Sequence, residues 1–363
     1  MMPPAPKDVG LFSEGPLEIL GLSHQQFSEA AQEILSALGE PHYRMHQLRD
    51  WIYKRTPDRF ELMSDLPRPL RERLQESLIL HPLDFELEKI SRDKTRKSLW
   101  RRKEGGTIES VLIPEPSRTT YCISTQAGCP VKCTFCATGV GGFLGQLRAS
   151  EIVDQVVSMR QRTGTPPTNI VYMGMGEPLL NFEAVLRSLE VLTDPNQVGF
   201  GARRITVSTV GIPERMRRLG DLFPQVKLAL SFHAARDELR DQIIPLNRKY
   251  PLKEVLAAAR DHARATGKRV TFEYIVLPGV NDTQRDSREI GRRLRDIPSR
   301  INLIGFNPFR GAPYEKPSVQ RLLVFRNWLE RDYRGTVTIR RSRGEDIDGA
   351  CGQLSLRRLE ARG

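Results

Sequence analysis

Three of the five cysteines fall in one short run whose spacing suits an iron–sulfur cluster. They are Cys129, Cys133 and Cys136, separated by three residues and then by two. Iron–sulfur clusters usually take four cysteine thiolates, so three ligands on a [4Fe–4S] cluster leave one iron without a protein donor. An iron with an open position can bind a small molecule, as catalytic zinc does. The run therefore predicts a cluster that takes part in chemistry.

Two other interpretations of this run are weaker. Three cysteines and a histidine could bind a structural zinc ion. The first histidine after Cys136 is His233, far along the chain, so zinc would need a distant ligand. Three unliganded thiols so close together are less favoured still. We therefore interpret the run as a cluster-binding motif.

The composition predicts a soluble, strongly basic protein. The chain has 363 residues, 39% of them hydrophobic, which is enough for one sizeable core and a smaller domain. Its five cysteines are too few for a disulfide scaffold. The sequence shows no secretory signal and no apolar run of 18 residues, so we expect a cytoplasmic protein that does not cross a membrane. The net charge of +12 favours a polyanionic partner, although a basic surface that only maintains solubility is an equal alternative.

From about residue 117 the pattern alternates between strands and helices, which predicts a parallel sheet with crossover helices. Six such units are too few for the closed eight-stranded barrel. We therefore expect an α/β fold with an open, partial (β/α)6 barrel. The predicted strands are 119–124, 169–175, 204–210, 227–232, 270–277 and 301–306, and the predicted helices are 149–162, 182–193, 213–219, 236–242, 252–266 and 283–295.

The N-terminal part of the chain has a different character. Apolar residues at helical spacing follow Ser23, a predicted cap, and a second basic helix is expected at 43–55. Short alternating segments near 84–113 predict a β-extension. The expected organisation is a mobile arm (1–20), a small helical accessory domain that could contact RNA (21–82), the β-extension (83–116), the partial barrel (117–345) and a C-terminal loop (346–363).

Polar residues follow several predicted strands, at the end where parallel sheets carry functional groups. Gly174-Met-Gly176-Glu177 ends one strand, where glycine allows close approach and a carboxylate can accept from an ammonium group. Hydroxyl, imidazole and amide groups at the other strand ends could bind ribose, carboxylate or adenine. Each alone could be a helix cap or a turn, but together they favour a ligand site. These further residues are Ser208, Ser231, His233 and Asn307.

Two cysteines lie outside the run. Cys351 is flanked by small residues on a predicted accessible loop, which suits a reactive nucleophile, although a lone cysteine near a terminus is more often an ordinary free thiol. Cys122 lies on the strand that precedes the run and could be a buried small apolar side chain.

Several longer segments stand out in combination with the cysteine run. In combination they resemble the RlmN/Cfr family of radical S-adenosylmethionine (SAM) RNA methyltransferases, over about residues 20–355, and RlmN more than Cfr. The departures are slight, such as Gly349 and Phe232 where the family often has alanine and leucine. The segments are Trp51-Ile-Tyr-Lys, Ile108-Glu109-Ser-Val-Leu-Ile-Pro, Cys122-Ile-Ser-Thr-Gln-Ala-Gly-Cys129, Val171-Tyr-Met-Gly-Met-Gly-Glu-Pro178, Arg204-Ile-Thr-Val-Ser-Thr-Val-Gly211, Ser231-Phe-His-Ala, Gly305-Phe-Asn-Pro-Phe and Arg343-Gly-Glu-Asp-Ile-Asp-Gly-Ala-Cys351-Gly-Gln-Leu.

The resemblance implies a role for each cysteine. One SAM would methylate Cys351, and a second, cleaved on the cluster, would yield a radical that takes a hydrogen atom from this S-methyl group. The resulting carbon radical would add to adenine, and Cys122 would then attack Cys351 to form a disulfide and release the base. Glu109 would be a proton acceptor, whereas on its own it reads as a strand carboxylate facing solvent. The implied cluster ligands are Cys129, Cys133 and Cys136, and the implied SAM-binding residues are Gly176, Glu177, Ser208, Ser231, His233 and Asn307.

The resemblance also implies the substrate and partners. Family members of the RlmN type methylate C2 of an adenine in 23S rRNA at the peptidyl-transferase centre, and some also methylate the adenine 3′ of the anticodon in certain tRNAs. We expect a monomer that receives electrons from a donor such as flavodoxin or ferredoxin. The alternatives are C8 methylation of the same rRNA adenine, as in Cfr, a radical SAM enzyme with a substrate other than RNA, and a non-catalytic RNA-binding protein with a structural metal.

Overall fold

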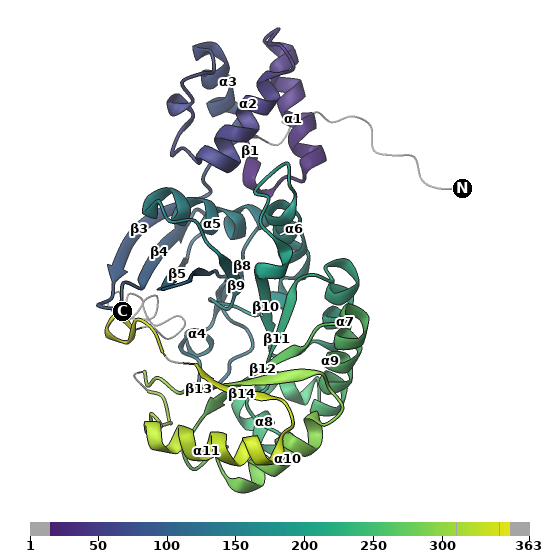
Figure 1. Cartoon of the computed structure of the whole chain (residues 1–363). Coiled ribbons are helices and arrows are strands. Elements are labelled where there is room, and N and C mark those ends of the chain that lie inside the picture. Colours follow the sequence, from purple (N-terminus) through teal and green to yellow (C-terminus); the bar gives the residue numbers. More distant parts are fainter. Residues whose placement is uncertain (1–14, 310, 341, 349–363) are drawn as a thin grey trace. The chain divides into compact units, whose positions relative to one another are not determined.

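The computed structural model describes residues 15–309, 311–340 and 342–348, which form two compact units (Figure 1). The first unit contains the residues up to Asp84 together with 148–165 and 187–200. The second contains 85–147, 166–186 and the residues from Gly201 onward. Among the described residues, none of the helices is long and apolar enough to cross a bilayer.

The first unit is mainly helical, as the periodicity of its sequence predicts. Ser23 caps the first helix through a capping box: its hydroxyl accepts from the Gln26 amide, and the Gln26 side chain accepts from the Ser23 amide. This confirms the predicted cap. The regular elements of this unit are β1 (Leu17–Glu18), α1 (His24–Ala37), α2 (Arg44–Asp50), a π-helical turn (Trp51–Arg55), α3 (Arg68–Ser77), β2 (Leu78–Ile79) and α5 (Ala149–Thr163).

The second unit is built on one sheet of ten strands among its described residues, in the order β14-β13-β12-β11-β10-β9-β6-β5-β4-β3. The six predicted parallel strands are present as neighbours in this sheet. The β-extension joins the same sheet through antiparallel pairing of β5 with β6. The strands are β3 (Leu83–Ile90), β4 (Arg96–Arg102), β5 (Thr107–Glu115), β6 (Arg118–Cys122), β9 (Asn169–Tyr172), β10 (Ile205–Thr209), β11 (Lys227–Ser231), β12 (Val270–Val276), β13 (Ser299–Gly305) and β14 (Thr336–Arg340).

One face of the parallel strands is apolar and almost fully buried. Side chains alternate between faces along a strand, so residues paired across strands share a face. Figure 1 shows α7 (Pro213–Leu222), α9 (Leu252–Thr266), α10 (Gln284–Leu294) and α11 (Val319–Asp332) along the outer side of these strands. The apolar face contains Tyr121, Ile170, Tyr172, Val207, Leu228, Leu230, Phe272, Tyr274 and Leu303.

Two elements at the C-terminal end of the sheet were not predicted. The helix α11 begins at Ser318, whose hydroxyl accepts from the Arg321 amide, and the strand β14 pairs in parallel with β13. Along β14 only Val337 is buried, because this strand lies at the end of the strand order and is polar on most positions. Edge strands of this kind lack the apolar runs by which the central strands are found.

A half-buried histidine, His81, stabilises the first unit. His81 Nδ1 lies 2.7 Å from Asp154 Oδ1 on α5, and its Nε2 lies 2.9 Å from the carbonyl oxygen of Pro57. Burial alone would lower the pKa of His81, but the Asp154 carboxylate and the Pro57 carbonyl outweigh it and raise this pKa to about 9. The imidazolium form therefore links the end of the helical segment to α5.

This link predicts a pH-dependent stability. The folded pKa of about 9 exceeds the ordinary value of 6.5, so the contribution is complete below pH 6.5 and disappears as the pH rises through 9. The ~2.5-unit difference corresponds to at most about 3 kcal/mol. Urea unfolding should show that His81→Gln loses more stability relative to the wild type at pH 6 than at pH 10. An equal loss at both pH values would contradict the charged link.

Candidate active site

The cysteine run forms a loop whose backbone is packed against a second loop. Gly128 has φ of +75°, and a Cβ atom there would lie 2.1 Å from the carbonyl oxygen of Gly142, so no other residue fits without displacement. The Cys129 amide donates to the same oxygen at 2.7 Å. After Cys136 the chain enters the short helix α4 (Ala137–Val140). The local sequence therefore defines where the thiols lie.

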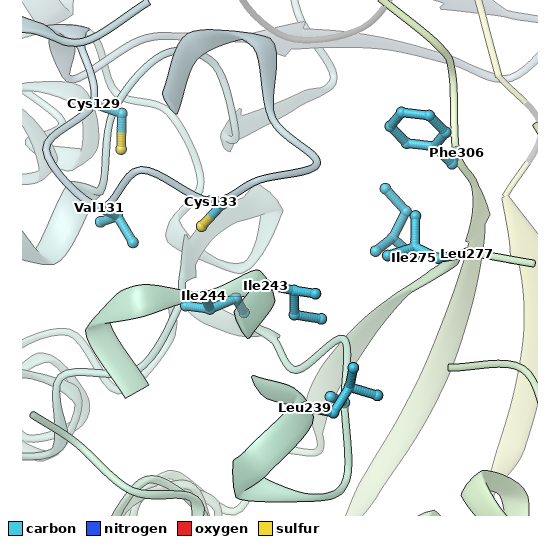
Figure 2. Packing of buried hydrophobic residues seen from close by; sticks show 10 residues of the cluster. Cys129, Val131, Cys133, Leu239, Ile243, Ile244, Ile275, Leu277 and Phe306 are labelled. Carbon is cyan, nitrogen blue, oxygen red and sulfur yellow. The ribbon is translucent and has the colours of Figure 1, made fainter. Parts of the chain in front are cut away.

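The thiols lie in an apolar environment at the carboxyl ends of the strands. Figure 2 shows Cys129 and Cys133 with Val131, near Ile243 and Ile244. Burial raises the pKa of Cys129 to about 12 and raises the pKa values of the other two thiols, which therefore keep their protons unless a cation replaces them. Cys129, Cys133, Val131, Ile243 and Ile244 belong to one group of buried apolar residues. The other members of this group are Ala234, Leu239, Ile275, Leu277 and Phe306.

Three thiols in an apolar environment are compatible with the ligand set of a [4Fe–4S] cluster. Within the described ranges, no three His, Cys, Asp or Glu side chains converge as ligands of one ion. In a cluster, each thiolate binds a different iron, so such convergence is not needed. An apolar shell around sulfur ligands is also what an iron–sulfur site uses to limit solvent access.

Glu177 is held at the edge of the same region by backbone amides. Its two carboxylate oxygens accept from the Leu179 amide at 3.0 Å and the Val210 amide at 2.8 Å, and only 3% of Glu177 is exposed. Burial raises the pKa of Glu177, while a Thr209 hydrogen bond and these amides oppose the rise. A carboxylate has about four acceptor positions, so capacity remains for a further donor.

The glycines before Glu177 are required by close packing. Gly176 has φ of +100°, and a Cβ atom there would lie 2.5 Å from the Cβ of Gln126. A Cβ atom on Gly174 would lie 2.8 Å from the backbone of Ile123. The Gln126 side-chain oxygen in turn accepts from the Glu177 amide at 2.7 Å. The motif therefore places Glu177 next to the segment that leads into the cysteine run.

The second face of the sheet carries polar side chains, and two of the predicted strand-end residues, Ser208 and Ser231, lie on it. Ser231 pairs in register with Glu273, Glu273 with Asn302, and Ser208 occupies the corresponding face of β10. Glu273 is 5% exposed; its Oε1 accepts from Asn302, and its Oε2 has no hydrogen-bond partner among the described residues. Burial raises the pKa of Glu273.

His233 and Asn307 lie on loops after β11 and β13. His233 has φ of +56°, and its Nδ1 accepts from the Ile275 amide at 3.0 Å. Burial lowers the pKa of His233 to about 3, so the ring is neutral at pH 7 and carries its proton on Nε2. The ring of Phe135, inside the cysteine run, packs edge-on against His233 at 4.7 Å. Asn307 donates to the Ser342 hydroxyl at 3.1 Å.

Glu109 and Cys122 are brought together on the polar face. Cys122 pairs in register with Val111, which follows Glu109 by two residues on β5 and therefore shares its face. Glu109 is only 3% exposed, so its interpretation as a solvent-facing carboxylate is wrong. Burial raises the pKa of Cys122 to about 11, against smaller opposing effects from nearby cations. Cys351 lies outside the described residues.

Three side chains that contact these residues were not singled out from the sequence. Lys97 Nζ lies 3.3 Å from Glu109 Oε2. Ser124 donates to the Glu109 carbonyl and accepts from the Met175 amide. Arg240 on α8 (Asp237–Ile243) donates to the carbonyl of Ser231. Lys97 lies two residues before Leu99 on β4 and so shares its face, and a charged residue beside an apolar one on a strand face could have drawn attention to it. No local pattern distinguishes Arg240 from a surface arginine.

Comparison with known proteins agrees with this geometry. The sequence profile of the Radical SAM superfamily matches residues 123–289, and that of the ribosomal RNA large subunit methyltransferase N-terminal domain matches residues 17–80. The dual-specificity RNA methyltransferase RlmN of Desulfotalea psychrophila is 44% identical, over 93% of this chain and 95% of the relative. The chain belongs to the RlmN family of radical SAM RNA methyltransferases.

Other members of the RlmN family support the same assignment. The dual-specificity RNA methyltransferase RlmN of Halorhodospira halophila is 45% identical and covers 94% of each chain. The crystal structure of a radical SAM methyltransferase from Sphaerobacter thermophilus superimposes with a TM-score of 0.88 at 43% identity, over 93% of this chain and 99% of that one. The predicted fold class is confirmed, and the superfamily implies SAM and a [4Fe–4S] cluster as cofactors.

The contacts of Glu177 predict two separable effects of Glu177→Gln. The new amide group would oppose one of the two backbone amides, so stability should fall by about 1–3 kcal/mol. SAM affinity should also fall, because a charge-assisted bond to an ammonium group contributes about 1.5–3 kcal/mol. Chemical denaturation measures the first effect and calorimetric titration with SAM the second. SAM affinity equal to that of the wild type would exclude Glu177 as the ammonium acceptor.

Proposed function

We propose that this protein methylates C2 of an adenine in 23S rRNA at the peptidyl-transferase centre, and the adenine 3′ of the anticodon in some tRNAs. The observation that carries the proposal is the common face shared by Glu109 and Cys122, on the same sheet whose strand ends surround the cysteine run. A generic radical SAM enzyme has no need of a second, separate cysteine at this place. The relatives' name, dual-specificity RNA methyltransferase, supports both classes of RNA.

The cofactors would be held by the strand ends described above. We assign Cys129, Cys133 and Cys136 as the cluster ligands, because Cys129 and Cys133 belong to one group of buried apolar residues and Cys136 packs against it. We assign the SAM site to Gly176, Glu177, Ser208, Ser231, His233 and Asn307, and expect two SAM molecules per turnover. When bound, the cluster and SAM supply one-electron chemistry that removes a hydrogen atom from an unactivated C–H bond.

Cys351 is the proposed methyl carrier. Its thiolate would displace the methyl group of one SAM, so that a thioether forms and S-adenosylhomocysteine leaves. After this S-methyl group has lost a hydrogen atom, its carbon would add to the adenine ring and join Cys351 to the RNA. The protein then needs a base and a second thiol to release the product.

Glu109 and Cys122 would complete the release. After the carbon has added, the ring must lose one electron, which the bound cluster would accept, and one proton from the ring carbon, which Glu109 would accept; the burial of Glu109 limits competing water. The Cys122 thiolate would attack the sulfur of Cys351 and form a disulfide; the electron pair of the broken sulfur–carbon bond passes to the departing carbon, which takes up a proton to become the methyl group of the base. Because burial raises the pKa of Cys122 to about 11, the side chain is a neutral thiol at pH 7. It must lose its proton before it can attack the sulfur of Cys351.

The RNA partner agrees with the charge of the chain. The net charge of +12 favours contact with a phosphate backbone. The accessory domain at 21–82 would contribute to this contact through exposed basic residues such as Arg55 and Arg59. We further propose that the protein acts as a monomer, with electrons supplied by a small carrier such as flavodoxin or ferredoxin.

Nucleoside mass spectrometry tests the proposal directly. Reconstituted protein, SAM and a chemical reductant would be incubated with unmodified 23S rRNA fragments and tRNA. The expected product is 2-methyladenosine in both RNAs. The appearance of 8-methyladenosine instead would assign the Cfr reaction, and the absence of product in both RNAs, with intact SAM cleavage, would indicate a different substrate.

The cluster assignment predicts selective loss of iron. Single Cys→Ala variants at 129, 133 and 136 should each lose the visible absorbance of the cluster and the cleavage of SAM after anaerobic reconstitution. Cys122→Ala is the matched control, because this thiol is also buried but lies on β6 and not in the run, and the variant should retain iron. If one of these three Cys→Ala variants keeps all of its iron and still cleaves SAM, the cysteine that it lacks is not a cluster ligand.

Variants of the two remaining cysteines, Cys351 and Cys122, should lose activity at different steps of the reaction. Cys351→Ala should never acquire a methyl group, which intact mass measures. Cys122→Ala should acquire the methyl group and react with RNA but not release it, leaving a protein–RNA adduct that survives denaturation. Normal turnover by either variant would refute the proposed division of roles.

A further inference from the structure

The last described residues of the chain are docked on the turn between β3 and β4. Asp346 accepts from the Ser91 hydroxyl at 2.5 Å, and the Gly344 amide donates to Asp93 at 3.1 Å. Both contacts lie within the second unit. They give the segment 343–348 a defined place beside the strands that carry Glu109 and its neighbours.

One buried ammonium group bridges this segment and the carboxylate of Glu109. Lys97 on β4 is 1% exposed, and its Nζ lies 3.3 Å from Glu109 Oε2. The same Nζ donates to the carbonyl oxygen of Asp348 at 2.5 Å. Lysine is almost never fully buried unless it is paired, so the site is built around these acceptors.

The sheet register places the bridge next to the proposed resolving thiol. Lys97 pairs with Val111, and Val111 pairs with Cys122, so the three residues follow one another across β4, β5 and β6 on one face. Glu109 is the diagonal neighbour of Lys97 on that face. The ammonium group therefore touches the proposed base, lies near the proposed resolving thiol and holds the C-terminal segment.

Docking of the segment and orientation of Glu109 cannot be independent in this arrangement. If Asp348 left, the buried ammonium group would lose an acceptor in a region of low dielectric constant, which is unfavourable. Its remaining attraction to Glu109 would then determine a different position of both side chains. Asp348 precedes Cys351 by only three residues, so a contact that holds Asp348 also limits how far Cys351 can reach.

We propose that Lys97 is a positioning residue that couples the docking of the C-terminal segment to the orientation of Glu109. Its consequence for methyl transfer rests on the function proposed above, whereas the docking itself does not. Methyl loading and methyl transfer would both use a segment whose last described residue, Asp348, is held by one buried charge. The coupling ensures that Glu109 is aligned when the methyl carrier is in reach.

Hydrogen–deuterium exchange of the reconstituted protein tests the docking. In Lys97→Met, which keeps the length of the side chain but removes its charge, peptides covering 343–348 should exchange about 10- to 100-fold faster, the factor for one lost hydrogen bond to a charged donor. Lys97→Arg should restore part of the protection because it keeps the charge. The matched control is Lys103→Met on the same hairpin, which is exposed and should exchange like the wild type. Wild-type exchange in Lys97→Met would overturn the proposal.

Two further variants keep the test decisive. If Lys97→Met alone does not fold, the double variant Lys97→Met/Glu109→Gln removes both buried charges and should fold, yet still show fast exchange at 343–348. Protection equal to the wild type in the double variant would also overturn the proposal. Glu109→Gln alone should load the methyl group but lose transfer to RNA, and because the coupling is reciprocal it should change exchange at 343–348, by less than Lys97→Met does.

Measurements of methyl loading and methyl transfer separate a steric role of Lys97 from a role of its charge. If Lys97 had a purely steric role, Lys97→Met would retain both methyl loading and methyl transfer to RNA. Because the coupling requires a charge, we expect Lys97→Met to lose both activities and Lys97→Arg to retain them in part. If Glu109→Gln retains full RNA methylation while Lys97→Met still releases the segment, the role given to Glu109 fails and the docking inference stands.

Discussion

The buried guanidinium of Arg240 holds together the strand ends on which the candidate site is built. It donates to the carbonyls of Val210, Ser231 and Phe232 and to the side-chain oxygen of Asn247. Burial lowers the pKa of Arg240 to about 10, so it remains charged at pH 7. A buried cation that lost these acceptors would be strongly destabilising, and the ends of β10 and β11 therefore stay where their carbonyls meet it.

The same requirement governs the other charged groups of the site. Glu177 is satisfied by two backbone amides, and Lys97 and Glu109 compensate one another in the interior. Arg240 also opposes the effect of burial on the thiol of Cys133. Each of these charged side chains is thus held by backbone groups or by an opposite charge, which keeps its position constant before any ligand binds.

Much of this site could be predicted from local sequence. The spacing of the cysteine run indicates a cluster without knowledge of the fold, because its three cysteines lie within eight residues of one another. The six parallel strands were found because each is a short apolar run between helical patterns. The strand β14 has no apolar pattern because it lies at the end of the strand order and only Val337 is buried along it. The helix α11 carries apolar residues, of which only Phe325 and Leu329 are buried.

The sequence by itself determined the cysteine motif, the glycines that accompany Glu177 and the alternation that produces the fold. Only the tertiary structure decided that Glu109 is buried, that it faces Cys122, and that Lys97 joins it to Asp348. These contacts depend on the register between strands and on residues about 250 positions apart in the chain, as for Lys97 and Asp348. A local pattern shows which side chains share a face of one strand, but the partner that each meets is set by how distant strands pair and by the need to neutralise charge away from water.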